Sequence, residues 1–103
     1  MPYINEEERI ELDAAIENMT QSIRDIQCHL GNPHDFSIYL GRINYCFSRV
    51  IAGLMKDVSY KKIAMITGVL ENIKQEFYRR VAENYENNKI AQHGDIKEYK
   101  NLK

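Results

Sequence analysis

This 103-residue sequence lacks several features that would assign it to a large protein class. It has no tryptophan, two prolines and two cysteines, and it has no glycine-rich stretch of the kind that binds phosphate. Its longest uncharged apolar run, Val50 to Met55, is far shorter than the roughly 20 residues that a membrane-spanning helix needs. Its first residues, MPYINEEER, are acidic where a signal peptide is basic. We therefore expect a cytoplasmic protein without a membrane partner.

The two cysteines predict neither a disulfide nor a metal site. Cys28 and Cys46 lie within helical patterns, which suits small, reduced core side chains. A zinc site built from these cysteines with His29 and His34 is the alternative, but the spacing matches no standard zinc finger. Adjacent residues on a helix also point about 100° apart. We expect no metal and no cofactor.

The acidic residues do not form the pairs that hold a catalytic magnesium ion. An all-helical nucleotide pyrophosphatase needs acids on facing helices, whereas the second helical stretch has acids only at its ends, Asp35 and Asp57. Glu71 and Glu76 are five residues apart and so lie about 140° apart around a helix. We therefore predict that the protein is not an enzyme and has no catalytic residues.

Three stretches of the chain carry apolar residues at steps of three and four. This is the period of one buried stripe on an amphipathic helix. The apolar fraction of 44% and the charged fraction of 28% are ordinary for a folded globular protein. The three stripes are Leu12, Ile16, Met19, Ile23, Ile26 and Leu30; Phe36, Leu40, Ile43, Phe47, Val50 and Leu54; and Ile63, Ile66, Leu70, Ile73, Phe77 and Val81.

Capping residues set the expected ends of these helices. Asn5 begins a capping box, so we expect the first helix over residues 6–29. Asp35 is available as the cap of the second helix. The third begins after Ser59 and ends before Gly94, and the weak helix former Asn84 leaves a kink or break open.

Helices with one apolar face each and no strands to cover them must pack against each other. The short links favour antiparallel neighbours, so the sequence predicts an all-α, antiparallel three-helix bundle with a long third helix. We expect one helical domain over residues 1–94 and a polar tail over residues 95–103. A domain this small has a modest core, and self-association into a homo-oligomer would supplement it.

Charge is unevenly distributed. Residues 5–30 carry seven acids and two bases, whereas residues 58–82 carry five bases and two acids. Solvated or mutually attracting helix faces explain this pattern. The net charge is -1 and no basic stripe follows a whole element, so we expect no nucleic-acid partner.

One group of polar and aromatic side chains lies beside the apolar stripes. A purely structural explanation is that Asn44 makes one buried hydrogen bond to a neighbouring helix and that Arg49 stacks on Tyr45. The functional interpretation is a pocket in which aromatic rings stack on a base and guanidinium groups bind phosphate. Within this group we expect Arg80 to serve the ligand and Arg79 to reach Glu83 at the surface. The candidate ligand-binding residues are Asn44, Tyr45, Arg49, Tyr78, Arg79 and Arg80.

Three segments together carry a resemblance to a known group of proteins. MPYINEEER, GRINYCFSRV and GVLENIKQEFYRRVAENYENNKIAQHGD resemble a family of short, functionally uncharacterised proteins from phages and bacterial genomes. The resemblance implies a phage or prophage origin and an accessory role exerted by binding. It also implies a proline where this chain has Asn84.

Two functions remain open. The first is an oligomeric, non-enzymatic sponge that sequesters a nucleotide-derived immune signal, such as a cyclic dinucleotide or an ADP-ribose derivative, between helices or subunits. The second is a protein-interaction module that uses the apolar face of the second helix or the overhanging end of the third to inhibit or adapt a host factor.

Overall fold

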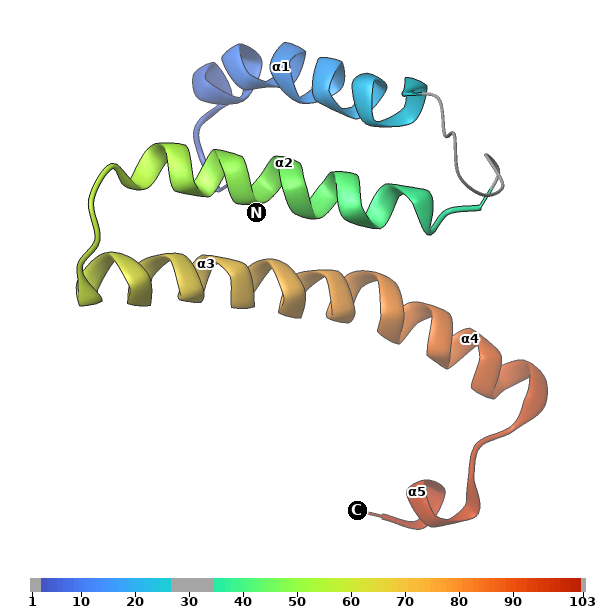
Figure 1. Ribbon diagram of the computed structural model, residues 1–103. Coiled ribbons are helices and arrows are strands. Elements are labelled where there is room, and N and C mark those ends of the chain that lie inside the picture. The colour runs from blue at the N-terminus through green and yellow to red at the C-terminus, as the bar shows by residue number, and fades with distance from the viewer. Residues whose placement is uncertain (1–2, 27–34, 103) are drawn as a thin grey trace. The chain divides into compact units, whose positions relative to one another are not determined.

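The computed structural model describes residues 3–26 and 35–102, and every regular element in those ranges is a helix (Figure 1). The all-α prediction is confirmed. The elements in chain order are α1 (Glu6–Asp25), α2 (Ile38–Met55), α3 (Tyr60–Phe77), the π-helical turn η1 (Tyr78–Ala82), α4 (Glu83–His93) and α5 (Lys97–Asn101).

The chain divides into two compact units, Met1–Lys56 and Asp57–Lys103, and each is described by itself. The first unit holds α1 and α2, and the second holds α3, η1, α4 and α5. The three-helix bundle, the single domain over residues 1–94 and the homo-oligomer therefore stay predictions.

The start of α1 follows from its capping residue. The Asn5 side chain accepts a hydrogen bond of 2.9 Å from the Glu8 backbone N–H, as the predicted capping box requires. Three glutamates occupy the first turn, where the positive end of the helix dipole favours them. The helix ends at Asp25, and the predicted continuation over residues 27–29 lies outside the described residues.

The start of α2 is organised by Asp35, although the helix itself begins at Ile38. The Ser37 backbone N–H donates to Asp35 Oδ1 at 3.0 Å. Hydrogen bonds from the Ser37 backbone and side chain lower the pKa of Asp35, because they stabilise its charged form. At the other end, Lys56 adopts a φ of 63°, which lies in the region that favours glycine and stops the helix.

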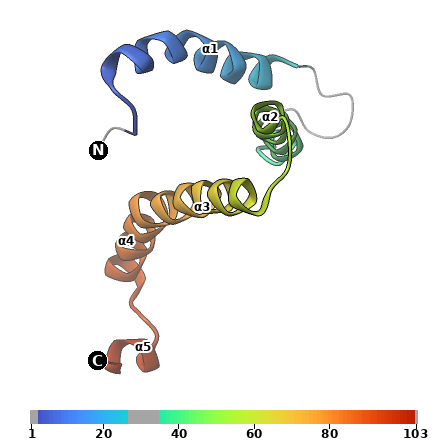
Figure 2. The ribbon, with the colours of Figure 1, turned by 90° about the vertical axis from the view of Figure 1, so that its left-hand side faces the viewer.

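An arginine joins α1 to α2. Arg42 of α2 donates to the Ile23 carbonyl at 2.6 Å and to the Ile26 carbonyl at 3.0 Å. The last carbonyls of a helix lack partners within the helix, and a cation at that end complements its dipole. Figure 2 views α2 end-on and shows α1 crossing it near the C-terminal end of α1, while the N-terminal half of α1 extends away. Arg42 therefore caps the C-terminal end of α1 although it belongs to α2.

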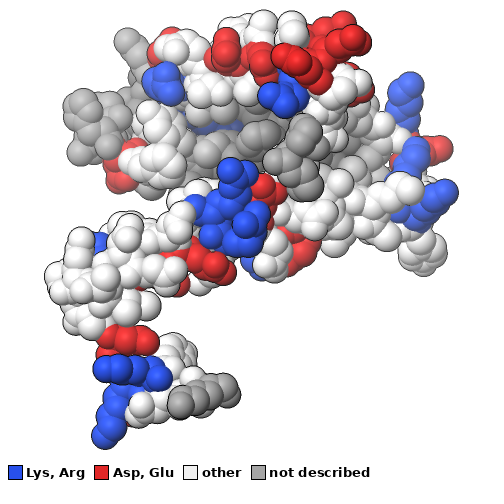
Figure 3. Space-filling model, turned by 180° about the vertical axis from the view of Figure 1, so that it is seen from behind, with Lys and Arg blue, Asp and Glu red and all other residues white. Residues whose placement is uncertain are grey.

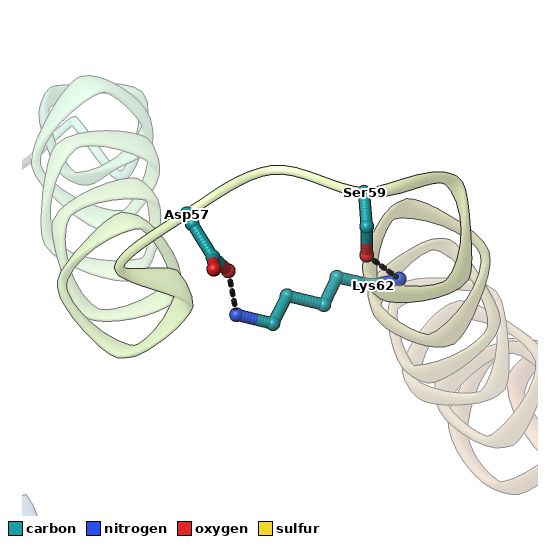
Figure 4. Close-up of polar contacts among 3 residues, drawn as sticks. All are labelled: Asp57, Ser59 and Lys62. Atoms are coloured by element: carbon teal, nitrogen blue, oxygen red, sulfur yellow. Dashed lines mark hydrogen bonds and ion pairs between the residues drawn. The ribbon is translucent and has the colours of Figure 1, made fainter.

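The second unit begins with the predicted cap. The Lys62 backbone N–H donates to Ser59 Oγ at 3.1 Å, which starts α3. The Lys62 ammonium group also pairs with the Asp57 carboxylate, so the same lysine reaches back across the turn (Figure 4). The Lys62 backbone thus binds Ser59 at the start of α3, and its side chain binds Asp57 earlier in the same link.

The long helix passes through a π turn before Asn84 and then continues through Asn84 without a break. In η1 the Glu83 N–H donates to the Tyr78 carbonyl, five residues earlier. The Asn84 side-chain amide donates to the Arg80 carbonyl at 3.1 Å. A π turn opens the backbone ladder, and this amide supplies a partner for one of its carbonyls. The sequence left open a kink or break at Asn84. The structure instead has one inserted residue in the preceding turn, η1.

The end of the long helix is also as predicted. Gly94 has a φ of 89° and donates its N–H to the Ile90 carbonyl at 2.7 Å, which closes α4. The following residues, predicted as a polar tail, contain the short helix α5.

No side chain in the described part of the chain is fully buried. The best covered apolar residues, such as Ile43 and Cys46 of α2, are half-buried. Ile73 and Phe77 of α3 remain 61% and 63% exposed. The apolar stripes therefore still present surface on which further packing can occur.

The Arg42 contact predicts a specific loss of stability. Arg42→Met keeps an apolar stem and removes both hydrogen bonds, so we expect the free energy of unfolding to fall by about 1.5–3 kcal/mol. Urea unfolding followed by circular dichroism measures this change. Arg9→Met is the matched control, since exposed surface changes stay within about 0.5 kcal/mol. Equal values for the two variants would contradict a capping role.

Candidate functional site

The candidate residues fall into two clusters, one in each unit of the chain. Asn44, Tyr45 and Arg49 lie on α2, whereas Tyr78, Arg79 and Arg80 lie in η1. Each cluster is held by contacts within its own unit. In the first cluster Tyr45 and Arg49 contact each other. In the second, Tyr78 contacts Glu86 and Arg80 contacts Glu76.

On α2 the predicted stacking of Arg49 on Tyr45 is present. The Arg49 guanidinium carbon lies 5.7 Å from the centre of the Tyr45 ring, and Arg49 Nη1 donates to the phenol oxygen at 3.5 Å. Asn44 accepts a hydrogen bond of 3.1 Å from the Ser48 hydroxyl, within the same helix. The suggested hydrogen bond from Asn44 to a neighbouring helix is therefore not what the structure shows. Arg49 forms no ion pair among the described residues, so its positive charge is not neutralised there.

A pocket of about 310 Å³ lies beside the Tyr45–Arg49 pair. A volume of this size is at the lower end of small-molecule sites. Apolar side chains from both helices of the first unit form its walls and the arginine supplies its charge. The lining residues are Met19 of α1 with Tyr45, Cys46, Arg49 and Val50 of α2.

In η1 the π turn changes which residues share a helix face. Tyr78 and Glu86 are eight positions apart, so a regular α-helix would place them about 80° apart. The extra residue of the π turn removes about 100° of rotation, which brings them to about 20°. The Tyr78 hydroxyl accordingly donates to Glu86 Oε1 at 3.2 Å.

This contact changes the acidity of the phenol. The negative charge of Glu86 and its hydrogen bond raise the pKa of Tyr78 above the ordinary value of 10.0, with smaller contributions from desolvation and Glu83. The phenol hydroxyl is therefore engaged with a neighbouring carboxylate.

The two arginines of η1 have different surroundings. Arg80 Nη1 pairs with Glu76 Oε1 at 2.9 Å, and the Glu76 side chain is only 20% exposed. Among the described residues no ion pair joins Arg79 to Glu83. The arginine that the sequence assigned to a ligand is therefore already neutralised by a carboxylate, which makes Arg49 the stronger anion-binding candidate.

A second pocket of about 310 Å³ lies on the apolar face of α2, which the sequence offered as a surface for a protein partner. It is a groove between α1 and α2 whose lining is mostly apolar, and it lies on the α2 stripe that the sequence did identify. Phe36 and Tyr39 meet edge to face at its wall, with ring centres 5.4 Å apart. We call this surface the aromatic groove, and it is lined by Thr20, Ile23, Arg24, Phe36, Tyr39, Ile43 and Phe47.

Sequence reasoning also missed Arg42 and Glu86. No local signal in the sequence identifies the role of Arg42, because its carbonyl partners Ile23 and Ile26 lie 19 and 16 residues away. Glu86 had a subtle signal. The stripe steps by four twice in succession around Val81, and repeated steps of four indicate an inserted residue.

Other chemistries find little support in the described ranges. No three His, Cys, Asp or Glu side chains there are placed to hold a metal ion. Cys46 is a half-buried free thiol, while Cys28, His29 and His34 of the alternative zinc site lie outside the described residues. No helix in the part of the chain that the structure describes combines the length and hydropathy that a membrane crossing needs. Acidic side chains gather over α1, at the top of Figure 3.

The Tyr78 contact predicts a titration that can be observed directly. Glu86→Gln removes the charge and should lower the pKa of Tyr78 toward 10.0. Because the folded-state pKa is raised, the contact stabilises the fold below about pH 10 and this contribution is lost as the pH rises through the pKa of Tyr78. NMR titration of ring-labelled tyrosine measures it, with Tyr99 as an internal control. An unchanged Tyr78 titration in Glu86→Gln would refute the contact.

The comparisons with known proteins add a family and no activity. Residues 1–96 match a family described as Domain of unknown function (DUF6899). No curated protein and no solved structure matches the chain. Because the match covers nearly the whole sequence, the chain belongs to the DUF6899 family.

Proposed function

We propose that this protein is a non-enzymatic interaction module that docks an amphipathic helix of another protein in the aromatic groove of α1 and α2. The observation that carries the proposal is a mostly apolar groove that remains open in the first unit. Phe36 and Phe47 at its wall are 68% and 53% exposed. Large apolar side chains are costly to leave in water, and an amphipathic helix in a groove is a common way to cover them.

The spacing of the groove residues supports a helical occupant. Phe36, Tyr39, Ile43 and Phe47 follow one face over about three turns of the chain. Anchors at such spacing match the i, i+4, i+7 anchors of a docked helix.

The negative charge of α1 favours a positively charged partner helix. α1 carries seven acids and two bases along its 20 residues, and its three first-turn glutamates are exposed. A partner helix with lysine or arginine beside its apolar face would gain attraction and faster association from this field.

A binding assay with a defined probe tests this proposal. We expect a synthetic helix of leucine and lysine, about 18 residues long, to bind the protein, and Phe47→Asp to weaken binding at least tenfold, because burying a charge in an apolar contact is unfavourable. Fluorescence anisotropy gives the dissociation constants. The double variant Arg79→Ala and Arg80→Ala, which leaves the groove untouched, is the control.

The same variants decide whether a natural partner uses the groove. A partner captured from host cells should rebind in purified form to the wild-type protein and to the arginine double variant, and not to Phe47→Asp. Circular dichroism confirms that Phe47→Asp remains helical. Equal binding by all three proteins would reject the groove as the docking surface.

The Tyr45–Arg49 pocket favours a second candidate function, the sequestration of a nucleotide-derived immune signal. A ring stacks on a base and an unneutralised guanidinium binds phosphate, and Asn44 lies on the same helix as a hydrogen-bonding side chain. The resemblance to phage proteins motivates the immune role. In this proposal the protein acts in the host cytoplasm as a phage accessory factor.

Thermal unfolding with a panel of cyclic dinucleotides and ADP-ribose derivatives tests the second candidate. A ligand at 100 times its Kd adds about 2.7 kcal/mol of stability, which raises the Tm of a domain of this size by roughly 10 °C or more. Arg49→Met should abolish the shift, whereas Arg79→Met should preserve it. An unchanged Tm with the whole panel would exclude this function.

We also propose the antiparallel three-helix bundle as the arrangement of the two units. α2 and α3 contain 18 residues each and are joined through Lys56–Ser59, so antiparallel packing would match their lengths.

A further inference from the structure

The helix from α3 through α4 carries an apolar stripe with the spacing of a coiled coil. Steps of three and four place these residues at the a and d positions of successive heptads. Five of the seven side chains are at least 47% exposed, and Ile73, Phe77 and Tyr85 exceed 60%. We call this stripe the apolar seam, and it consists of Ile63, Ile66, Leu70, Ile73, Phe77, Val81 and Tyr85.

The π turn keeps the end of this seam aligned with its beginning. Ile73 and Tyr85 are 12 positions apart, which a regular α-helix would turn into a separation of about 120°. The residue inserted in η1 removes about 100°, so the two side chains lie within about 20° of each other. The step from Phe77 to Val81 then acts as a step of three, and the heptad pattern has no interruption.

This alignment disrupts the regular backbone hydrogen bonds, and a helix surrounded by water would gain nothing from that disruption. A π turn opens the regular hydrogen-bond ladder, and here a side-chain amide partners one of its carbonyls. Besides the contact of Tyr78 with Glu86, the turn gives the helix a straight apolar seam. A straight seam stabilises the protein only when another helix covers it.

The length of the seam points to a partner beyond α2. Ile63 to Tyr85 spans about 33 Å, whereas the 18 residues of α2 span about 27 Å. An antiparallel α2 that starts beside the first turn of α3 would reach no further than Phe77. Val81 and Tyr85, the two positions that the π turn brings into line, would stay uncovered.

A second copy of the same helix, parallel and in register, covers all seven positions with their own equivalents. The residues that flank the seam also accept this arrangement, because no two like charges face each other across it. The flanking pairs are Lys62 with Thr67, Val69 with Lys74, and Glu76 with Ala82.

We propose that the apolar seam is the interface of a parallel homodimer and that the π turn Tyr78–Ala82 absorbs one residue and so keeps the two halves of the seam in line. This interface goes beyond the docking function proposed above and uses a different surface from the aromatic groove. Either proposal can therefore fail without the other.

Mass measurement on the full chain tests the interface. We expect sedimentation equilibrium to give twice the monomer mass of 12.1 kDa. Ile73→Asp should raise the dissociation constant of the dimer at least tenfold, because it places a charge in the seam. Asn72→Asp adds the same charge one position outside the seam and should change the constant less than about twofold. A monomer at every concentration, or a dimer lost on Phe47→Asp and kept on Ile73→Asp, overturns the proposal.

Cross-linking tests the orientation without depending on a destabilising charge. In a Cys28→Ser, Cys46→Ser background, Ile63→Cys should give disulfide-linked dimers under mild oxidation, since the parallel arrangement brings the two positions together. Ala64→Cys points away from the seam and should remain monomeric on a non-reducing gel. No cross-link from either variant, or equal cross-linking from both, would overturn the parallel dimer.

Single-residue deletions test the role of the π turn. Deletion of Arg79 should convert η1 to a regular turn and leave Val81 and Tyr85 on the seam, so the dimer should persist within about twofold in affinity. Deletion of Asn72 rotates the following seam residues by about 100° and should weaken the dimer at least tenfold. The same loss from both deletions would show that the π turn does not absorb an extra residue of the seam.

Discussion

The period of the apolar residues is the constraint on which every other feature of this protein depends. Each long helix has one apolar stripe, and no strand in the described ranges offers another surface to cover it. No described side chain is fully buried. Helices of this kind gain most of their stability from packing and little from intrinsic propensity. A functional account of the protein therefore begins with what covers its stripes.

Within the first unit, a polar contact decides how the apolar faces meet. Arg42 fastens α2 to the terminal carbonyls of α1, and the two pockets of this unit are both lined by residues from those two helices. One is mostly apolar and aromatic, with Arg24 in its lining, and the other pairs a tyrosine with an arginine. The geometry of both surfaces rests on the same guanidinium group, although that group lines neither of them.

In the second unit, one inserted residue has two effects. The π turn brings Tyr78 and Glu86 together and raises the pKa of the phenol. It also keeps Val81 and Tyr85 in line with the apolar residues of α3. Both effects follow from the same removal of about 100° of helical rotation. Arg79 and Arg80 therefore belong to a turn with a structural role, and Arg80 is paired with Glu76.

The sequence by itself determined the helices, because caps and apolar period are local properties: Asn5, Ser59 and Gly94 set boundaries through neighbouring backbone groups. The stacking of Arg49 on Tyr45 was equally predictable, since residues four apart share a helix face. Only the tertiary structure decided that Arg42 caps a different helix, because its carbonyl partners lie 16 and 19 residues away and no local rule selects them.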